Sequence, residues 1–403
     1  MKYIVVLGDG MADYPVKELG NQTPLDCANK PNMDRLCKEG VLGLVSHVPD
    51  SLSPGSDVAN LSAMGYDPVA YYTGRSPLEA VSMGIDILES DVVFRCNLVT
   101  LSEGGEYRGK TILDHSADEI TTAEARALIA EVEKSFGTQT MKFYPGVSYR
   151  HALVWQNGPE KPQLTPPHDI LEKPITDYLP KGEGSDVLSN MMEQSYALLK
   201  NHPINQKRRE RGLRPANSIW IWGEGKKPRL DSFYEKFGLR GAVISAVDLI
   251  KGIAICAGMK AIDVPGATGN IHTDFDAKAQ ACLDALSDGY DFVYIHIEAP
   301  DECGHRHEID NKVRAISLID EKVVGKITRE LDQKGEDYRM LILPDHPTPL
   351  SLRTHTKDPV PYILYDSRKK GDSGFSCYCE KNAKLANVYE KAGYNLLKAF
   401  LEK

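Results

Sequence analysis

Three residues that could bind a metal ion or move protons stand close together near the end of the chain. Asp345 and His346 follow the apolar run Leu341–Leu343, and His355 lies in the turn-rich stretch beyond them, "PTPLSLRTHTKDPVP". The chain contains only 11 histidines, so two of them in this stretch are notable. Carboxylates and imidazoles just past a predicted strand are typical of a metal site or of acid–base catalysis.

Residues of the same types follow two other predicted strands. Asp9 comes after the strand Tyr3–Leu7, and Asp301 and His305 come after the strand Val293–Ile297. Ligand-binding residues gather beyond the carboxyl ends of the strands in open parallel sheets, so we expect all these side chains to share one site. A single such aspartate is ordinarily a helix cap, and a single loop histidine is ordinarily solvated. Their recurrence at several strand ends favours the shared site.

The chemistry of this set favours two divalent cations. Carboxylate oxygens mixed with imidazole nitrogens suit Zn²⁺ or Mn²⁺ better than Ca²⁺, which prefers oxygen ligands alone. The set has more ligands than one tetrahedral ion needs. A pair of ions would use them all, and such pairs stabilise the attacking and leaving oxygens of phosphoryl transfer.

A serine in "SLSPGSDVANLSAMGYDP" is the candidate nucleophile. Pro54 and Gly55 predict a turn, Ser56 falls at or near the start of a helix, and apolar residues follow at helical spacing. The helix dipole and the free amides at such a position favour negative charge. The alternative is that Ser56, or Ser53, only caps the helix. A metal ion on the hydroxyl would ease its deprotonation and make it a nucleophile.

The elements that must position these residues alternate in type. A strand at Tyr3–Leu7 and a helix from Pro31 to Gly40 are followed, late in the chain, by repeated strand and helix patterns. The predicted strands there lie at Val243, Ile262, Val293–Ile297, Leu341–Leu343 and in "PVPYILYD". We therefore predict an α/β fold, with a mostly parallel sheet that helices cover on both faces.

The middle of the chain has a different texture. Alternating segments such as "YRHALVWQNG", a proline-rich loop and two helical patterns predict a smaller inserted α+β domain. We place this domain at residues 86–215 and expect residues 1–85 and 216–403 to form the core domain.

Composition excludes several classes of protein. A net charge of −9, with no long basic run, argues against nucleic acid as a partner. The apolar start is too short for a signal peptide or a membrane span, so we expect a cytoplasmic protein with no membrane partner. The eight cysteines lie singly except for the pair Cys377 and Cys379, and we expect reduced thiols. The sequence leaves the oligomeric state open.

The motifs together resemble a known family. The segments "GDGMAD", "TPLDCANKPNMDRL", "PGSDVANLSAMGYDP", "YYTGRSPLEA", "EAPDECGH", "PDHPTP" and "HTKDPVP" are similar to the archaeal-type cofactor-independent phosphoglycerate mutases of the alkaline phosphatase superfamily. The resemblance covers nearly the whole chain and implies an alkaline phosphatase-like core. It also implies one metal ion on Asp9, Ser56, Asp345 and His346, and a second on Asp301, His305 and His355.

By the same resemblance, Ser56 would accept the phosphoryl group of a small phosphorylated metabolite and return it to another hydroxyl. This would interconvert 2-phosphoglycerate and 3-phosphoglycerate, a step of glycolysis, with Mn²⁺, Zn²⁺ or Mg²⁺ and without bisphosphoglycerate. The phosphate needs cations to hold it, so we expect basic residues of the inserted domain to bind the substrate. The candidates are Arg75, Arg150, His151, Asp169, Arg208 and Lys226.

One segment departs from the family pattern. Where these mutases have a basic stretch, this chain has "ILDHSADEI", with Asp114, Asp118 and Glu119. Carboxylates there would suit an acceptor bearing an ammonium group, and a branch of the family proposed to act as homoserine kinases is also similar. A homoserine kinase-like phosphotransferase and a metal-dependent phosphatase are therefore the alternative functions.

Overall fold

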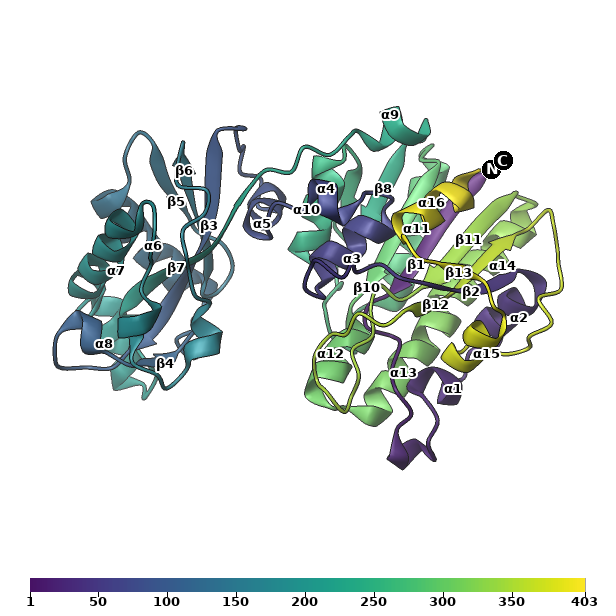
Figure 1. The fold of residues 1–403 in the computed structure, drawn as a ribbon, viewed down its shortest axis with the longest axis horizontal. Coiled ribbons are helices and arrows are strands. Elements are labelled where there is room, and N and C mark those ends of the chain that lie inside the picture. Colours follow the sequence, from purple (N-terminus) through teal and green to yellow (C-terminus); the bar gives the residue numbers. More distant parts are fainter. Residues whose placement is uncertain (403) are drawn as a thin grey trace. The chain divides into compact units, whose positions relative to one another are not determined.

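The computed structural model describes residues 1–402 of the chain, which forms two units (Figure 1). The first unit comprises Met1–Tyr72 together with the chain from Arg229 onward, and the second comprises Thr73–Pro228. The boundaries predicted from the sequence assign residues 73–85 and 216–228 to the core domain, but both segments belong to the second unit. In the structure α5 (Ser76–Ser82) packs on strands β3 and β7 of the second unit.

An eight-stranded sheet forms the centre of the first unit, in the order β13-β2-β12-β11-β1-β10-β8-β9. Its central strands are parallel, whereas β12 runs antiparallel to both β11 and β2. The predicted α/β class with a mostly parallel sheet is therefore confirmed. The strands are β1 (Lys2–Gly8), β2 (Val41–Val45), β8 (Gly241–Ile244), β9 (Lys260–Ile262), β10 (Phe292–Ile297), β11 (Tyr338–Leu343), β12 (Val360–Asp366) and β13 (Tyr389–Glu390).

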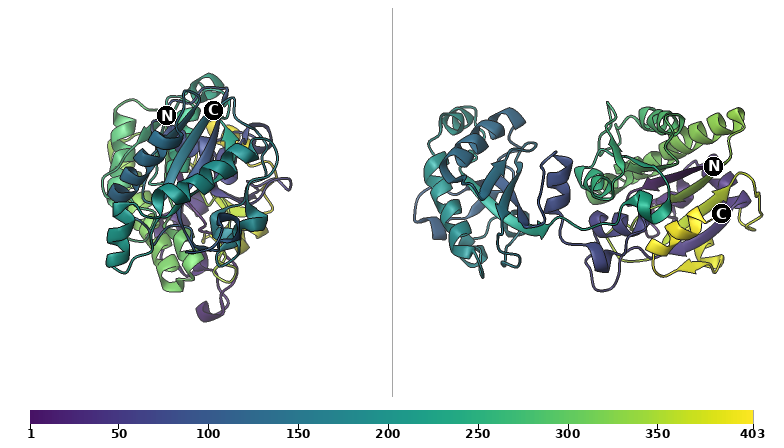
Figure 2. Two further views of the ribbon diagram at one scale, coloured as in Figure 1. Left: turned by 90° about the vertical axis from the view of Figure 1, so that its left-hand side faces the viewer. Right: turned by 90° about the horizontal axis from the view of Figure 1, so that it is seen from above.

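Helices cover both faces of this sheet (Figure 1 and Figure 2). The central strands are therefore buried over nearly their whole length, which explains why β1, β10 and β11 appear in the sequence as nearly continuous apolar runs. One face packs on α2 (Pro31–Glu39), α11 (Phe275–Ser287), α13 (Ile309–Leu318) and α14 (Gly325–Lys334). The remaining helices of this unit are α1 (Pro24–Cys27), α3 (Ser56–Ala63), α4 (Pro68–Tyr71), α9 (Phe233–Phe237), α10 (Asp248–Cys256), α12 (Ala299–Arg306), α15 (Glu380–Leu385) and α16 (Tyr394–Leu401).

The second unit is an antiparallel sheet with helices packed against it, and it has its own hydrophobic core. The long strand β3 (Asp91–Leu101) pairs with β4, β6 and β7. The other strands are β4 (Ile112–Asp114), β5 (Met141–Tyr144), β6 (Arg150–Gln156) and β7 (Ser218–Lys226), and the helices are α5, α6 (Thr122–Phe136), α7 (Ser185–Leu199) and α8 (Pro203–Glu210). This is the α+β composition expected of the inserted segment.

Within residues 1–402, no helix combines the length and the apolar character that crossing a lipid bilayer requires.

Candidate active site

The predicted ligands lie at one edge of the first unit's sheet. Strand β1 lies between β10 and β11 and is parallel to both, so the carboxyl ends of the three strands are adjacent. Asp9 follows β1, and Asp345 and His346 follow β11. After β10 the chain enters α12, which contains Asp301 and His305.

The direction of β12 keeps a further ligand at this edge. Because β12 is antiparallel to β11, it begins at the same edge where β11 ends. The loop between the two strands therefore stays beside the other ligands. This loop contains His355, whose ring stacks on that of His346 with centroids 4.0 Å apart.

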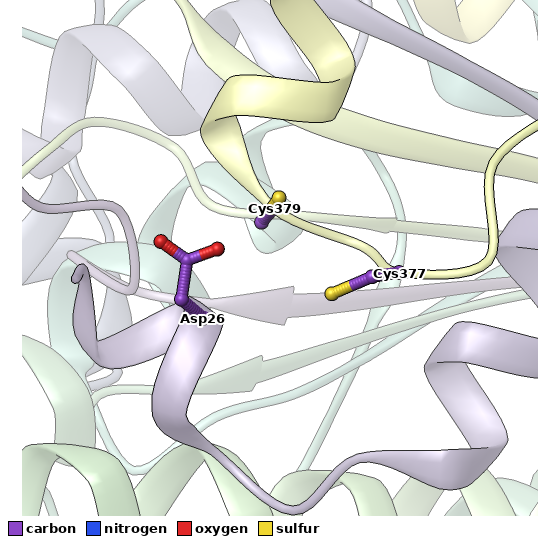
Figure 3. A group of neighbouring side chains, drawn as sticks. All are labelled: Asp26, Cys377 and Cys379. Atoms are coloured by element: carbon purple, nitrogen blue, oxygen red, sulfur yellow. The ribbon is translucent and has the colours of Figure 1, made fainter.

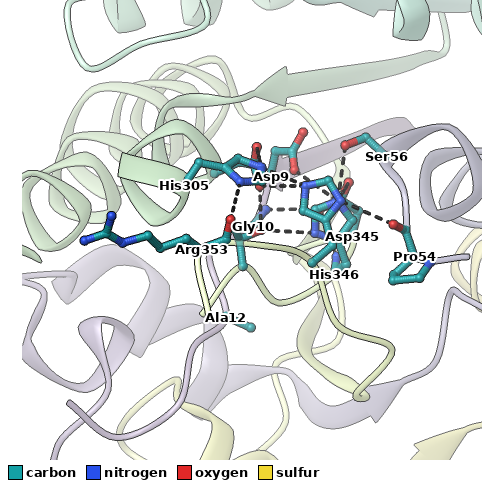
Figure 4. Close-up of polar contacts among 12 residues, drawn as sticks. Asp9, Gly10, Ala12, Pro54, Ser56, His305, Asp345, His346 and Arg353 are labelled. Atoms are coloured by element: carbon teal, nitrogen blue, oxygen red, sulfur yellow. Dashed lines mark hydrogen bonds and ion pairs between the residues drawn. The ribbon is translucent and has the colours of Figure 1, made fainter. Parts of the chain in front are cut away.

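Ser56 enters the site from helix α3 and is its first residue. The N-cap is Gly55, and no side chain caps this helix. The Ser56 hydroxyl instead lies 3.2 Å from Nε2 of His346 (Figure 4). The structure therefore places the serine as predicted at the helix N-terminus, but its side chain faces the cluster of ligands.

Asp301 and His305 lie side by side because they are four residues apart on one face of α12. Nε2 of His305 is 3.2 Å from Asp301 Oδ2. This hydrogen bond is the main reason why the pKa of His305 rises to about 9. Burial acts to raise the pKa of Asp301, but its hydrogen bonds with His305 and His355 bring it well below the usual range.

The rings of His305 and His355 are held with the same nitrogen pointing into the site. Nδ1 of His305 lies 2.9 Å from the carbonyl oxygen of Arg353, and Nδ1 of His355 lies 3.4 Å from that of Pro54. A carbonyl oxygen can only accept, so each Nδ1 carries the proton. The two Nε2 atoms lie 3.0 Å apart, and each offers its lone pair once its ring is neutral, as it must be to bind a metal ion.

His346 is also oriented by a hydrogen bond at its Nδ1. Its Nδ1 is 3.3 Å from the hydroxyl oxygen of Thr348, which donates its own proton to Asp301. That oxygen must therefore accept from Nδ1, and this leaves the Nε2 lone pair free. Nε2 lies 3.4 Å from Asp345 Oδ2 and 3.6 Å from Asp9 Oδ1.

Asp9 offers one oxygen to the site. Nε2 of His296, a buried residue of β10, lies 2.9 Å from Asp9 Oδ2. Oδ1 of Asp9 is buried and has no hydrogen-bond partner. Burial and then the charges of Asp345 and Asp301 raise the pKa of Asp9 well above its usual value. A buried acceptor of this kind, beside two more carboxylates, is the environment that a cation stabilises.

The ligand atoms form two groups that share a histidine. The ligand atoms of Asp9, Asp345 and His346 lie within 4.8 Å of one another, and so do those of Asp301, His346 and His355. All seven residues predicted to bind metal are thus brought together, and the mixed oxygen and nitrogen donors fit divalent cations such as Zn²⁺ or Mn²⁺. The position of His346 between the groups was not foreseen.

Asn60 and Tyr294 also support the ligands, and neither was predicted from the sequence. The side-chain amide of Asn60 donates to Asp345 Oδ2 at 2.8 Å and to the backbone oxygen of Ser56 at 2.9 Å. The hydroxyl of Tyr294 donates in turn to Asn60 Oδ1 at 2.6 Å. Asn60 lies one helical turn after Ser56, so the spacing of four residues was the signal that could have found it.

Gly10 allows the closest packing in the site. Its φ is +60°, and a Cβ atom there would lie 2.8 Å from Cα of Asp301. Its amide donates to Asp345 Oδ1 at 3.2 Å. The "GDG" motif therefore serves both as a turn that needs glycine and as a backbone donor that orients a ligand.

The second unit contains the six residues predicted to bind substrate, and four of them have charged groups that are at least partly exposed. Arg75 pairs with Glu79 at 2.8 Å, and Arg150 lies at the exposed start of β6. Asp169 is exposed beside His168, and Lys226 pairs with Glu160 at 2.5 Å.

The other two predicted substrate-binding residues are buried. Nδ1 of His151 accepts from the Gly146 amide at 3.0 Å, and burial lowers the pKa of His151 to about 3. Arg208 is 1% exposed and donates to Glu124, Ala117 and Arg214. These contacts join α8 to the chain around Ala117, so they identify Arg208 as a structural residue of this unit.

A group of aromatic and charged residues in the second unit was not predicted. The guanidinium of Arg95 lies 4.6 Å from the ring centre of Trp222, and the ring of His168 lies 5.3 Å from Trp222. Arg95 also pairs with Glu79, and the ring of His115 lies 6.1 Å from that of His168. His168 stands next to the predicted Asp169, but the sequence offered no reason to prefer the histidine.

Comparison with known proteins points to one family. A family model described as 2,3-bisphosphoglycerate-independent phosphoglycerate mutase matches residues 37–205. A probable enzyme of this description from Geobacter sulfurreducens is 50% identical over 404 residues and covers 100% of both chains. Enzymes of the same description are 50% identical in Methanothrix thermoacetophila, over 91% of both chains, and 46% identical in Methanosarcina acetivorans, over 96% of both chains.

Two solved structures share the fold. A protein from Pyrococcus horikoshii superposes with a TM-score of 0.82 at 28% identity, over 99% of this chain and 96% of the other. A cofactor-independent phosphoglycerate mutase from Thermoplasma acidophilum superposes with a TM-score of 0.68 at 24% identity, over 100% and 99% of the two chains.

Proposed function

This chain belongs to the family of 2,3-bisphosphoglycerate-independent phosphoglycerate mutases, and we propose that it interconverts 2-phosphoglycerate and 3-phosphoglycerate through a phosphoserine on Ser56. The observation that carries the proposal is the position of the Ser56 hydroxyl. It starts a helix without capping it, and it lies 3.2 Å from His346 Nε2 among buried carboxylates. A hydroxyl that served only the helix would not face these groups.

Two divalent cations fit between the ligand groups. Asp9, Ser56, Asp345 and His346 would hold one, and Asp301, His305 and His355 would hold the other, with His346 close to both. This is supported by Asp9 Oδ1, which is buried without a hydrogen-bond partner, and by the Nε2 atoms of His305, His346 and His355. The lone pairs of these nitrogens need a positive charge among them. When bound, the cations would lower the pKa of the serine hydroxyl and stabilise charge on the transferred phosphoryl group.

Ser56 and Asn60 have distinct roles in the proposed phosphoryl transfer. The bond from Ser56 Oγ to phosphorus forms as the bond from phosphorus to the substrate oxygen breaks; Ser56 loses a proton, the departing oxygen gains one, and glycerate is released within the site. The other hydroxyl of glycerate then attacks phosphorus, which restores free Ser56. Asn60 holds the backbone of Ser56 and the carboxylate of Asp345 in fixed positions throughout. No external bisphosphate enters this cycle, because the serine stores the phosphoryl group.

The acidic segment Ile112–Ile120 does not favour an ammonium-bearing acceptor. Asp114 accepts from the Ser116 amide and hydroxyl and from the Asp118 amide, and Arg214 lies 3.2 Å from it. Asp118 accepts from the Arg214 amide at 2.6 Å. Asp114 and Asp118 therefore serve the local turn, and Arg214 lies close to both. No specific observation favours the homoserine kinase or phosphatase alternatives.

The direct test is to incubate the manganese-loaded protein with 3-phosphoglycerate and to follow the formation of 2-phosphoglycerate. A rapidly quenched sample should contain one phosphoryl group per chain on the peptide that includes Ser56. Ser56→Ala should abolish both signals and leave the thermal stability nearly unchanged, because the hydroxyl caps nothing. The matched control is Ser53→Ala, which changes an exposed serine of the same loop and should keep full activity.

Two results would contradict the proposal. One is full conversion by Ser56→Ala. The other is rapid release of inorganic phosphate without 2-phosphoglycerate, which would identify a phosphatase. Transfer to added homoserine in place of glycerate would identify the kinase.

A further inference from the structure

A second reactive cluster lies in the first unit, among residues that the proposed phosphoryl transfer does not use. Cys377 and Cys379 stand just before α15, and Asp26 approaches them from α1 (Figure 3). The two sulfur atoms and a carboxylate oxygen of Asp26 lie within 4.8 Å of one another. Two thiols beside a carboxylate form a chemically asymmetric pair, because their neighbours differ.

A buried lysine contacts only one of the two sulfur atoms directly. Nζ of Lys30 lies 3.2 Å from Cys377 Sγ and 3.0 Å from Asp34 Oδ1, and the Lys30 side chain is 1% exposed. Burial acts to lower the pKa of Lys30, but Asp34 and then Cys377 raise it above its usual value. The lysine therefore keeps its charge, and an ammonium this close and this poorly screened favours a thiolate on Cys377.

Cys379 acts as the proton-bearing member of the pair. A hydrogen bond from Cys379 is the main cause that lowers the pKa of Cys377 to about 6, with Lys30 adding to it against the effect of burial. The same hydrogen bond, burial and contact with Asp26 raise the pKa of Cys379. The two shifts run in opposite directions, so Cys377 loses its proton before Cys379 does.

Access also separates the two sulfurs. Cys377 is half-buried, whereas Cys379 is 3% exposed. Cys27 is half-buried too, but burial and the charge of Asp26 raise its pKa. Cys27 and Cys377 therefore have similar access to solvent, but only Cys377 contacts the buried ammonium of Lys30. Cys27 is thus a matched control for Cys377.

We propose that Cys377 is a modification site, a reactive thiolate that hydroperoxides oxidise and that Cys379 then converts into an intramolecular disulfide. The Cys377 thiolate attacks one oxygen of hydrogen peroxide, an S–O bond forms, the O–O bond breaks, and hydroxide leaves and takes from solvent the proton that Cys377 had released, to give water. Cys379 sulfur then attacks Cys377, the S–S bond forms, and water leaves with the proton that Cys379 held. Two thiols lose two electrons in all, and one peroxide yields two waters.

A metal ion is the competing occupant of the cluster, since two sulfurs and a carboxylate are ligands for a soft divalent cation. The Lys30 ammonium opposes this, because it lies 3.2 Å from one of the three ligand atoms and repels a cation bound there. The experiment must therefore separate thiol chemistry from metal binding.

The test treats the reduced, manganese-loaded full-length chain with hydrogen peroxide at pH 7, with and without dimedone, and maps each cysteine by mass spectrometry. The wild type should form a Cys377–Cys379 disulfide, so that six of the eight thiols remain. Cys379→Ser should instead accumulate the dimedone adduct on Cys377. In alkylation by iodoacetamide at pH 7, Cys377 should react about tenfold faster than Cys27.

A lysine series checks the cause. Lys30→Met should slow alkylation of Cys377 several-fold, and Lys30→Arg should restore much of the rate. Lys38→Met, an exposed position of α2, should leave the rate unchanged. Equal reactivity of Cys27 and Cys377, or the absence of both the disulfide and the adduct, would overturn the proposal. The proposal would also be overturned if, after incubation with zinc, the wild type bound one equivalent more than the Cys377→Ser/Cys379→Ser double variant. That result would identify a metal site.

Discussion

The Nε2 atoms of His305 and His355 lie 3.0 Å apart, while the opposite ring nitrogen of each faces a backbone carbonyl. Two neutral imidazoles held in this way point lone pairs at each other, which is unfavourable unless a proton or a cation lies between them. Asp301 lies beside both nitrogens, at 3.2 Å and 3.4 Å. The arrangement therefore has the form of a cation site whose ligands are fixed from outside.

The first prediction concerns removal of the metal ions. Chelation should abolish mutase activity and lower the thermal midpoint, because the carboxylates of Asp9, Asp301 and Asp345 lose the positive charge that balances them. Free metal at a thousandfold above its Kd should stabilise the fold by about 4 kcal/mol relative to the chelated protein. Activity assays and calorimetric melts, before and after re-addition of Mn²⁺, measure both effects. Full activity and an unchanged midpoint after exhaustive chelation would show that the cluster works without cations.

The second prediction tests how the ligands are oriented. Thr348→Val removes the oxygen that accepts from His346 Nδ1 and the proton donated to Asp301. Metal affinity should fall about 10- to 100-fold, and excess metal should restore most of the activity. Titration of the metal-free protein, read by calorimetry, gives the affinities.

Thr328→Val is the matched control for this substitution. Thr328 is also buried, and its hydroxyl bonds only to backbone oxygens of its own helix. Its replacement should leave the metal affinity unchanged. An equal loss of affinity in the two variants would mean that Thr348 acts only through packing.

Much of this site could be predicted because strand ends are visible in a sequence. The apolar runs before Asp9 and Asp345 mark buried strands, and parallel strands must bring their carboxyl ends to one edge. Asp301 and His305 were predicted because they follow the strand Val293–Ile297, and their spacing of four residues places them on one face of α12. The direction of β12 could not be predicted, because an apolar run does not show whether its strand is parallel or antiparallel to its neighbour. Because β12 is antiparallel to β11, the loop that contains His355 stays at the sheet edge where the other predicted metal ligands lie.

The residues that were missed are those whose role depends on what lies across the fold. His296 sits inside the apolar run "FVYIHI" and has the appearance of a core histidine until Asp9 is seen 2.9 Å away. Arg208, by contrast, was predicted to bind substrate. Its basic neighbours in "KRRERG" suggested a surface for phosphate, but only a structure shows that Arg208 is buried among carbonyls and Glu124.

The third prediction separates two arginines that the sequence placed in one class. Arg75 has a side chain that is 46% exposed, so Arg75→Ala should leave the melting temperature nearly unchanged. Because we expect Arg75 to bind the phosphoryl group or the carboxylate of the substrate, KM should rise about 10- to 100-fold, and an unchanged KM would exclude this role. Arg208→Met should instead leave the backbone oxygens of Ala117 and Arg214 without their buried donor, while Glu124 keeps its pair with Arg211, and should cost about 1–3 kcal/mol of stability. Urea unfolding and steady-state kinetics on both variants give the comparison. A raised KM in a fully stable Arg208→Met would return that residue to the substrate site.

The fourth prediction concerns acid stability at the end of the chain. Nε of the nearly buried Arg339 donates to Asp366 at 2.7 Å, and Nη1 of Arg339 donates to the backbone oxygen of Phe400 in α16. Burial acts to raise the pKa of Asp366, but hydrogen bonds from Arg368 and Arg339 bring it down to about 2. Because the folded pKa lies below the ordinary value of 3.8, this carboxylate stabilises the fold above that pH, and the contribution is lost as the pH falls toward 2.

Asp366→Asn should therefore lower the free energy of unfolding by about 1–3 kcal/mol at pH 7, because it leaves Arg339 with a neutral acceptor. The difference from the wild type should shrink as the pH falls below 4, since the wild-type carboxyl then becomes neutral as well. Urea unfolding between pH 2 and pH 7 measures this difference. Asp263→Asn, at a side chain that is 86% exposed and paired with Lys251, should change stability by no more than about 0.5 kcal/mol. A difference for Asp366→Asn that stayed constant down to pH 2 would mean that the loss comes from packing of the amide, because only a charge on Asp366 can make it depend on pH in this range.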